Sequence, residues 1–302
     1  GPDGALYIAD MYRLVIEHPE WIPAAMQSRV DLRAGHNKGR IWKVFPKDAK
    51  LRPTPRLDKL PTHQLVFALN HPNGWQRDTV QRLLIKRNDP KSHQSLASIA
   101  ANSLRGIVRP QARIHALHTL AGMNALNKKI LVAALRDDHD AVREHAVRLC
   151  EGGNEALARQ CLTDKSPRVR RQVAFSLGNT ADTKAAEALV QLGHDKNADV
   201  RLAVKSSVKP HLSVMLREIF ASGKQPPQDI TSHLLKVATS GKNQQNLVQV
   251  LTEMSNPKYR LVKVKMMSGF LDTINAQNQT LTTFHKQANA PLRQAINGTE
   301  VL

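Results

Sequence analysis

The chain has 302 residues, of which 41% are hydrophobic, 4% aromatic and 23% charged, and its formal net charge is +19 at pH 7. This length and apolar content suffice for a sizeable core, so we expect a folded chain of one large or two modest domains and exclude a disordered one. No apolar run approaches the roughly twenty residues of a membrane-spanning helix, and no signal peptide is visible.

The first 45 residues predict two strands separated by a long loop. Residues 5–9 follow a turn that contains proline and glycine, and residues 41–45 alternate apolar and polar side chains. Between the strands, residues 19–28 favour a short helix. Two strands alone are marginally stable in water and leave unpaired edges, so we expect the rest of the sheet to be missing or supplied by a partner.

This segment resembles a known family. The stretches GPDGALYIADMYR, HPEWIP, DLRAG and GRIWKVFPK are similar to the last blade of the β-propeller in PVC-type haem-binding proteins, which are also described as membrane-bound dehydrogenases. In that family, HEAT-type repeats and a cytochrome c module follow the propeller, and HPNGWQRDTVQRLL at residues 71–84 resembles the first repeat. The resemblance implies a periplasmic or secreted, cell-envelope location. It also implies that haem c is bound by a C-terminal module that these 302 residues do not include. The chain itself is expected to bind no cofactor.

Asp10, Tyr12 and Arg13 end the first predicted strand. The resemblance implies that they line or support a substrate mouth in a complete protein, because propeller loops commonly build a site there. The simpler alternative is that they close the last blade. Under either interpretation they do not catalyse a reaction alone in this chain.

A basic, proline-rich stretch follows at residues 46–61. Its prolines remove backbone donors and disfavour helix, so we predict an extended linker and place a domain boundary there. From residue 62 to residue 302, the spacing of apolar side chains predicts paired helices. The first pair is predicted at residues 62–69 and 74–86.

A repeated motif organises these helix pairs. In the stretch DKSPRVRRQVAFSL, Asp164 precedes Arg170 by six residues, and apolar side chains then recur every four residues on one helix face. The same spacing joins Asp137 to Arg143 and Asp195 to Arg201, and weaker copies contain Arg77, Arg113 and Arg260. The copies recur about every thirty residues, which is typical of a repeat architecture.

Each strong copy is preceded by a second apolar helical stretch, so the repeating unit is a helix hairpin. One hairpin cannot bury both apolar faces, and neighbouring hairpins are therefore expected to stack. The Asp-to-Arg spacing at the turn into the second helix resembles the short form of the HEAT repeat. That resemblance implies a hydrogen-bonded ladder along the stack, formed by Asp137, Asp164 and Asp195 with Arg143, Arg170 and Arg201. We predict an all-α fold, an α–α superhelix with a small N-terminal two-strand β remnant.

The repeat pattern weakens after Arg201. Helices are predicted at residues 212–220, 230–237 and near 247–251, with a loop at 223–228. Residues 280–288 predict a last helix, which we interpret as a polar cap of the solenoid, and a loose tail is expected from about Asn297.

Residue types that support catalysis or metal binding are present but do not form a convincing set. His115 and His118 lie three residues apart on one predicted helix, yet no cysteine or carboxylate completes a metal site. No nucleophile elbow, phosphate loop or paired-carboxylate motif occurs. Cys150 and Cys161 fall on apolar helix faces and are expected to be buried free thiols. We therefore predict no catalytic residue, no metal site and no enzyme activity for this chain.

Cations on the second helices give the sharpest functional hypothesis. In HEAT-type stacks the second helices line the concave face, where cations can contact an acidic partner or follow a phosphate backbone. These cations are Arg82, Lys86, Arg148, Arg171, Lys205, Lys209, Lys263 and Lys265. Nucleic acid is disfavoured because the central repeats are nearly neutral and aromatic side chains are scarce.

The predicted function is a non-catalytic helical-repeat scaffold that contacts other domains of the same polypeptide and a protein partner. The family resemblance places it in a multidomain, dehydrogenase-like, haem-binding electron-transfer protein. The alternative is a nucleic-acid-binding solenoid with a basic concave face. Binding of duplex DNA at two salt concentrations distinguishes the two functions.

Overall fold

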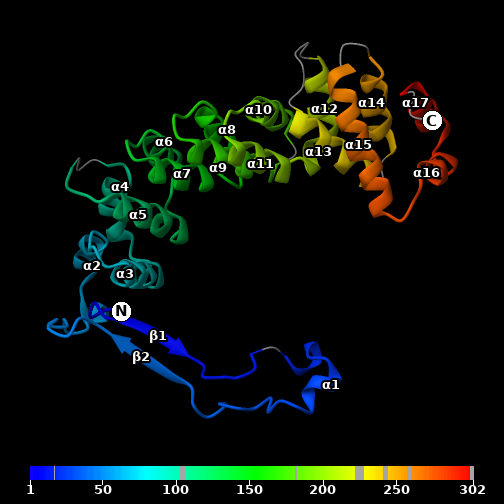
Figure 1. Ribbon diagram of the computed structural model, residues 1–302. Helices are drawn as coiled ribbons and strands as arrows, with labels where there is room; N and C mark the ends of the chain where they lie inside the picture. The colour runs from blue at the N-terminus through cyan, green and yellow to red at the C-terminus, as the bar shows by residue number, and fades with distance from the viewer. Residues whose placement is uncertain are drawn as a thin grey trace. The chain divides into compact units, whose positions relative to one another are not determined.

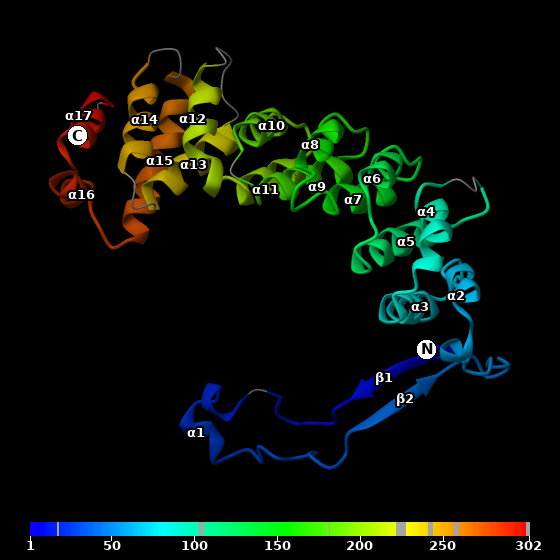
Figure 2. The same cartoon turned by 180° about the vertical axis from the view of Figure 1, so that it is seen from behind.

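The computed structural model describes the chain except for residues 17, 103–105, 181, 222–227, 241–243, 257–259 and 300–302, and the side chains of residues 220, 221, 228, 254 and 260–266. Helices dominate the described residues, and one two-stranded sheet lies at the N-terminus (Figures 1 and 2). The predicted fold class is therefore confirmed. The chain separates into two compact units, residues 1–96 and 97–302, which are described in turn.

The N-terminal unit begins with an antiparallel strand pair, β1 (Leu6–Asp10) and β2 (Arg40–Val44), in which Leu6 pairs with Val44. Each strand is displaced by one residue from its predicted range. The connection contains the 3-10 turn η1 (Pro19–Trp21) and the helix α1 (Ala24–Gln27) instead of one helix. Pro23 separates them, because its backbone is extended (ψ 133°) immediately before α1.

The linker holds one short regular element, the 3-10 turn η2 (Leu57–Lys59), and the helices α2 (Thr62–Ala68) and α3 (Gly74–Arg87) follow it. The compact unit that contains this linker continues to residue 96, and the domain boundary expected in the linker stays a prediction. Arg87 of α3 joins the linker to this helix. Its guanidinium donates to the carbonyl oxygens of Leu60 at 2.6 Å and Asp58 at 2.8 Å, and these bonds fix the end of the linker against α3.

The C-terminal unit consists of helix hairpins. The 3-10 turn η3 (Pro90–Ser92) precedes α4 (His93–Ala100), which spans the junction between the units. The elements that follow are α5 (Pro110–Gly122), α6 (Lys128–Ala134), α7 (Asp140–Arg148), α8 (Glu155–Ala158), η4 (Arg159–Cys161), α9 (Pro167–Leu177), α10 (Thr183–Gly193), α11 (Ala198–Ser206), η5 (Lys209–His211), α12 (Leu212–Ala221), α13 (Gln228–Ser240), α14 (Gln244–Met254), α15 (Arg260–Ala276), α16 (Leu281–Gln287) and α17 (Ala290–Gly298). No helix in the described part of the chain is long and apolar enough to cross a membrane.

Local chemistry explains where these helices begin. Pro110 and Pro167 occupy the first turn of α5 and α9, where a backbone N–H has no partner within the helix and its loss costs little. Asn127 and Asn197 precede α6 and α11, and their side chains accept hydrogen bonds from backbone N–H groups of the first turn.

Successive hairpins stack side by side in two layers (Figure 1). In one layer α5 packs against α7, α7 against α9, α9 against α11 and α13 against α15; in the other, α10 packs against α12 and α12 against α14. Val142, Val169, Val173 and Val200 are fully buried between them. This arrangement is the predicted α–α solenoid.

The C-terminal end differs from the prediction. The predicted loop at residues 223–228 lies largely outside the described residues, and α16 occupies the last predicted helix. The sequence predicts no helix between residue 288 and the tail expected from about Asn297, but α17 forms there, ends at Gly298 and packs against α14; residues 300–302 lie outside the described part. Leu292 and Ile296 of α17 are fully buried, so burial of apolar surface orders this segment.

Candidate functional site

Arginine and aspartate side chains form a ladder through the C-terminal unit. Arg143 donates through Nε and Nη2 to the two carboxylate oxygens of Asp164, at 2.7 and 2.8 Å. Arg170 binds Asp195 in the same way, at 2.6 and 3.0 Å. Such two-point pairs fix both position and direction. Each arginine therefore joins its own hairpin to the next one.

The six-residue spacing within each motif has a local cause. Nη1 of Arg143 donates to the backbone carbonyl oxygen of Asp137 at 2.8 Å, and Arg170 makes the same bond to Asp164 at 2.6 Å. The carboxylate of Asp164 also accepts the backbone N–H of Ser166 at 2.8 Å. One motif thus shapes the turn into the second helix and carries the contact to the next repeat.

The ladder is longer than the predicted one. Arg113 donates to Asp137 at 2.7 Å, and Arg201 donates to Asp229 at 2.9 Å. Asp229 was missed because Leu235, and not arginine, lies six residues after it. Its separation from Arg201 is 28 residues, close to the 21 and 25 residues in the two central pairs, and this spacing is the signal that could have found it.

Burial decreases toward the end of the ladder. The side chains of Arg143 and Asp164 are 6% and 10% exposed, whereas those of Arg201 and Asp229 are 27% and 38% exposed. The hydrogen bond from Arg170 holds the pKa of Asp195 below its ordinary value. Burial alone would raise the pKa of Asp164, but the bonds from Arg143 and from the Ser166 N–H outweigh it and the pKa is lowered. These carboxylates are therefore ionised at neutral pH.

Among the described side chains, some of the cations predicted to contact an acidic partner are already paired with carboxylates. Arg171 lies 3.7 Å from Glu144, and Lys205 lies 3.1 Å from Asp229, so both are paired. Arg148 is exposed at the end of α7.

The remaining predicted cations lie elsewhere. Arg82 and Lys86 are exposed on α3, in the N-terminal unit. Lys209 lies in η5 and not on a second helix, because Pro210 follows it and interrupts the helix pattern. Lys263 and Lys265 belong to α15, and their side chains lie outside the described residues.

Asp10, Tyr12 and Arg13 all bond within the N-terminal segment. Asp10 accepts hydrogen bonds from Trp42 Nε1 at 2.9 Å and Arg40 Nε at 3.1 Å, and Arg13 donates to the carbonyl oxygen of residue 32 at 2.8 Å. Tyr12 has a left-handed backbone (φ 50°). These contacts hold the two strands and their connection together.

Two of the histidines meet across helices. His118 of α5 and His145 of α7 lie edge to face, with Nε2 of the first 2.9 Å from Nδ1 of the second. Burial lowers the pKa of His118 to about 4 and also lowers the pKa of His145, so the pair is neutral and shares one N–H. Within the described residues, no group of three or more His, Cys, Asp or Glu side chains is arranged to hold a metal ion.

The two cysteines are buried free thiols, as predicted. Burial raises the pKa of Cys150 to about 12 and that of Cys161 to about 11. Both thiols are therefore protonated at neutral pH and are poor nucleophiles.

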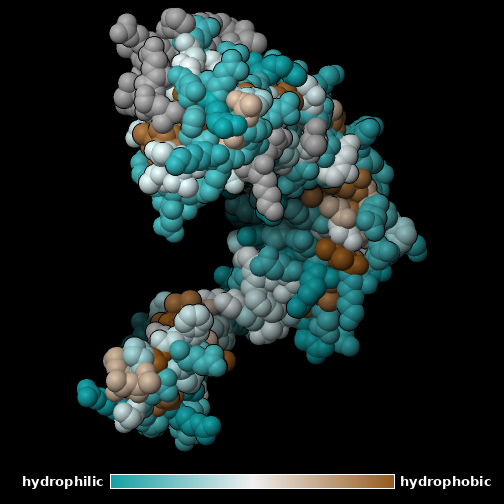
Figure 3. Space-filling view, turned by 90° about the vertical axis from the view of Figure 1, so that its right-hand side faces the viewer, coloured by the Kyte–Doolittle hydropathy of each residue, from teal (hydrophilic) through white to brown (hydrophobic). Residues whose placement is uncertain are grey.

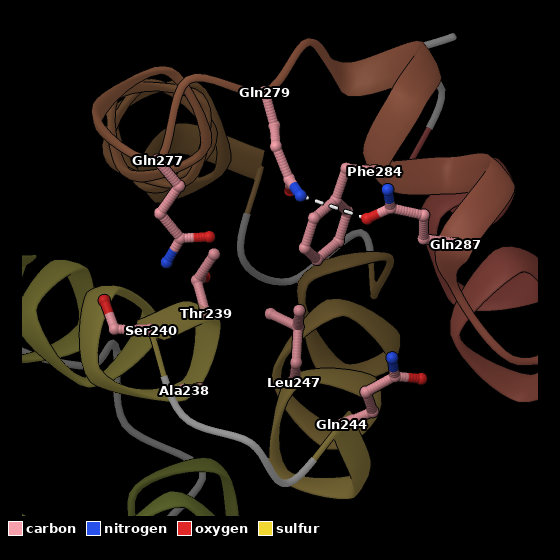
Figure 4. A pocket seen from close by; sticks show the side chains of 9 residues that line it. All are labelled: Ala238, Thr239, Ser240, Gln244, Leu247, Gln277, Gln279, Phe284 and Gln287. Atoms are coloured by element: carbon pink, nitrogen blue, oxygen red, sulfur yellow. Dashed lines mark hydrogen bonds between the residues drawn. The ribbon is translucent and has the colours of Figure 1, made fainter.

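A cavity of about 470 Å³ lies among α13, α14 and α16 (Figure 4). Its lining is uncharged and consists of Ala238, Thr239, Ser240, Gln244, Leu247, Gln277, Gln279, Phe284 and Gln287. Gln279 donates to Gln287 at 3.0 Å beside the ring of Phe284. Because the lining offers no general acid or base, we assign no reaction to this cavity.

Comparison with known families supports the repeat interpretation. Residues 128–209, which contain all three strong Asp-to-Arg motifs, match the family model described as HEAT repeats. This match lies within the C-terminal unit. Residues 1–48 match the model described as a domain of unknown function (DUF7133), and no curated protein matches the chain.

Three solved structures illustrate the similarity of the chain to known proteins. YibA from Escherichia coli is 18% identical with a TM-score of 0.44, covering 84% of this chain and 100% of that one. The CpcE–CpcF complex of phycocyanin lyase from Nostoc sp. PCC7120 is 13% identical with a TM-score of 0.38, covering 84% and 98%. A designed armadillo repeat protein is 16% identical with a TM-score of 0.32, covering 79% and 98%.

Proposed function

We propose that this chain is a non-catalytic scaffold whose second-helix face binds a protein partner. The second-helix face is defined by Glu144, Arg148, Arg168, Arg171, Phe175 and Leu202 on α7, α9 and α11. Relative to the ladder arginine of each helix, these residues lie two positions before it or one or five positions after it. Residues at such spacings share one side of a helix.

The composition of this face supports the proposal most directly. Phe175 and Leu202 are 42% and 64% exposed, and on the same face Glu144 pairs with Arg168 and Arg171. Protein interfaces combine aromatic and aliphatic anchors with charged surroundings in this way. The side of the molecule shown in Figure 3 is mainly hydrophilic with some hydrophobic patches.

The nucleic-acid alternative receives less support from the same contacts. A phosphate backbone is bound by cations that release counterions, which requires cations free of carboxylate partners. On these helices Arg171 and Lys205 already contact Glu144 and Asp229. Their charge is therefore largely used within the solenoid.

The wider setting of the scaffold rests on the family resemblance alone. It supports a multidomain, haem-binding electron-transfer protein of the periplasm or cell envelope, in which this region also contacts other domains of the same polypeptide. The sequence contains no Cys-x-x-Cys-His motif, so a haem c would be attached to another module.

Site-specific photo-crosslinking in the source cells tests the scaffold function. A photoreactive residue at position 202 of α11 is compared with one at position 187, where exposed Glu187 lies on α10 in the other helix layer. We expect protein adducts at position 202 and none at position 187. Equal adducts at both positions, or none at 202, would contradict the proposal. Tight duplex-DNA binding with a steep salt dependence would favour the alternative.

A further inference from the structure

A cavity at the start of the ladder contains buried oxygen atoms without hydrogen-bond partners. It has a volume of about 380 Å³ and is lined by Ala101, Asn102, Ala133, Arg136, Asp137 and Asp138. Oδ2 of Asp137 and Oδ1 of Asn102 are buried and unpaired. An unpaired buried polar atom costs about 1–3 kcal/mol, so such atoms are uncommon.

Hydrogen bonds fix one carboxylate oxygen of Asp137, and among the described residues the other oxygen makes none. Its side chain is 1% exposed, and its Oδ1 accepts from Arg113 at 2.7 Å and from the backbone N–H of His139 at 2.9 Å. The neighbouring Asp138 is 82% exposed and accepts from the same arginine at 3.1 Å. Two carboxylates therefore share one guanidinium, and among the described contacts Oδ2 of the first makes no hydrogen bond, while Nε of Arg113 is also buried and unpaired.

The other ladder positions show that this arrangement is particular to the first one. Asp164 is followed by Lys165 and Asp195 by Lys196, whereas Asp137 is followed by Asp138. A cation next to the ladder carboxylate is thus replaced by a second anion. Arg136 also lines the cavity, but it forms no ion pair with either carboxylate among the described contacts.

The electrostatics of Asp137 agree with this geometry. Burial raises the pKa of the Asp137 carboxyl, and so does its interaction with the neighbouring Asp138 carboxyl, although the bonds from Arg113 and from the His139 N–H oppose the effect. The carboxyl thus holds a proton more readily than an exposed aspartate does. A bound cation can stabilise the ionised form in place of that proton.

We propose that this cavity, the Asp137 niche, binds the guanidinium group of an arginine on a partner protein. Guanidinium has five N–H donors in a planar fork and is more weakly hydrated than ammonium, so it suits buried carboxylate oxygens. The methyl groups of Ala101 and Ala133 offer a wall for the aliphatic part of the side chain. This inference rests on the proposed scaffold function, because the arginine belongs to a protein partner.

The test is an NMR titration of the full chain, labelled with ¹³C at the aspartate carboxyl groups. Nα-acetyl-arginine amide is the probe, and the uncharged isostere Nα-acetyl-citrulline amide is its control. We expect the arginine derivative to shift the carboxyl signals of Asp137 and Asp138 in a saturable manner. The citrulline derivative is expected to leave them unchanged, because it carries no positive charge.

Two variants make the titration specific. Asp138→Lys copies the residue that follows Asp164 and Asp195, and we expect it to weaken binding of the arginine derivative at least about tenfold, a change of about 1.4 kcal/mol. Asp199→Asn removes an exposed carboxylate from the first turn of α11 and should leave binding unchanged. The niche assignment is overturned by the absence of a saturable shift, by equal binding of citrulline, or by full binding to Asp138→Lys.

The Asp138→Lys variant distinguishes an error in the niche proposal from an error in the proposed scaffold function. One outcome overturns the niche alone: photo-crosslinked adducts at position 202 form equally in wild type and Asp138→Lys, and the arginine derivative does not bind the wild-type chain. Arginine binding without any adduct at position 202 overturns the second-helix face as the partner site and leaves the niche in place.

Discussion

Arg143 and Asp164 are almost completely enclosed, with side-chain exposures of 6% and 10%. Removing one of them leaves the other buried without its partner, which costs about 3–5 kcal/mol. We therefore expect Asp164→Ala to lower the free energy of unfolding by about that amount. Urea unfolding followed by far-UV circular dichroism measures the change.

The end of the same ladder provides the control. Asp229 is 38% exposed, and exposed ion pairs contribute at most about 1 kcal/mol. Asp229→Ala should therefore lower the free energy of unfolding by less than a third of the decrease caused by Asp164→Ala. Equal losses in the two variants would show that burial does not determine the strength of the ladder.

The His118–His145 pair gives a second prediction for single residues, in this case for pH. Burial lowers the pKa of His118 from 6.5 to about 4, so between these values the unfolded chain binds the proton more readily than the folded chain. Stability is therefore lost as the pH falls from 6.5 toward 4, by about 1–3 kcal/mol from this residue.

Replacing His118 with glutamine keeps a polar group and removes the titration. We expect urea midpoints of His118→Gln to fall less steeply than those of wild type over this pH range. His63→Gln changes an exposed histidine of α2 and should follow the wild type. Parallel curves for wild type and His118→Gln would contradict the assignment of a buried neutral pair.

At the scale of elements, the residues that end α9 and α11 lie in close contact. A Cβ on Gly178 would lie 2.5 Å from Oγ and 3.1 Å from Cα of Ser207. The backbone of Gly178 is helical (φ −65°), so packing and not strain requires glycine here. Gly178→Ala should destabilise the chain by about 1–3 kcal/mol, as overpacking typically does.

A double-mutant cycle tests this contact. Ser207→Gly removes the two nearest obstacles, Oγ and Cβ, and leaves the Cα. It also removes the hydrogen bond from Ser207 to the carbonyl oxygen of Ala174 at 2.9 Å, at a cost of about 1 kcal/mol. Because the two residues touch, the combined variant should lose less stability than the sum of the single changes. Additive losses in thermal unfolding would exclude the contact as the cause.

The same elements show what the sequence can predict and what it cannot. The central hairpins were predictable because Val169, Val173 and Leu177 repeat at helical spacing and all face the core. Helix α17 was not predictable, because its short apolar pattern lies among amide-rich residues. The burial of this pattern depends on contact with α14, which is distant in the sequence. Tertiary contacts of this kind override local composition.

Of the two candidate sites, the ladder could be predicted from the sequence and the Asp137 niche could not. The ladder follows from the Asp-to-Arg spacing, since the motif builds both the turn and the bond to the next repeat. The Asp137 niche depends on which carboxylate oxygen remains unpaired, and this is set by the positions of Arg113 and His139. The sequence shows only that Asp138 occurs where the later motifs have lysine.

At the scale of the whole molecule, each compact unit has its own core and its own spectroscopic signal. Leu65, Val80 and Leu84 are buried in residues 1–96, and the buried valines of the solenoid lie in residues 97–302. All three tryptophans, at positions 21, 42 and 75, belong to the N-terminal unit, while most helices belong to the C-terminal one. Tryptophan fluorescence and far-UV circular dichroism therefore report mainly on different units.

This separation predicts how damage to the ladder affects the molecule. The ladder runs from Arg113 to Asp229, and Arg77 of α3 donates instead to the carbonyl oxygens of His71 and Pro72 in its own hairpin. We expect Asp164→Ala to lower the unfolding midpoint measured by circular dichroism and to leave that measured by tryptophan fluorescence unchanged. If both midpoints fall together, the two units unfold cooperatively, and the ladder stabilises the whole chain and not its C-terminal unit alone.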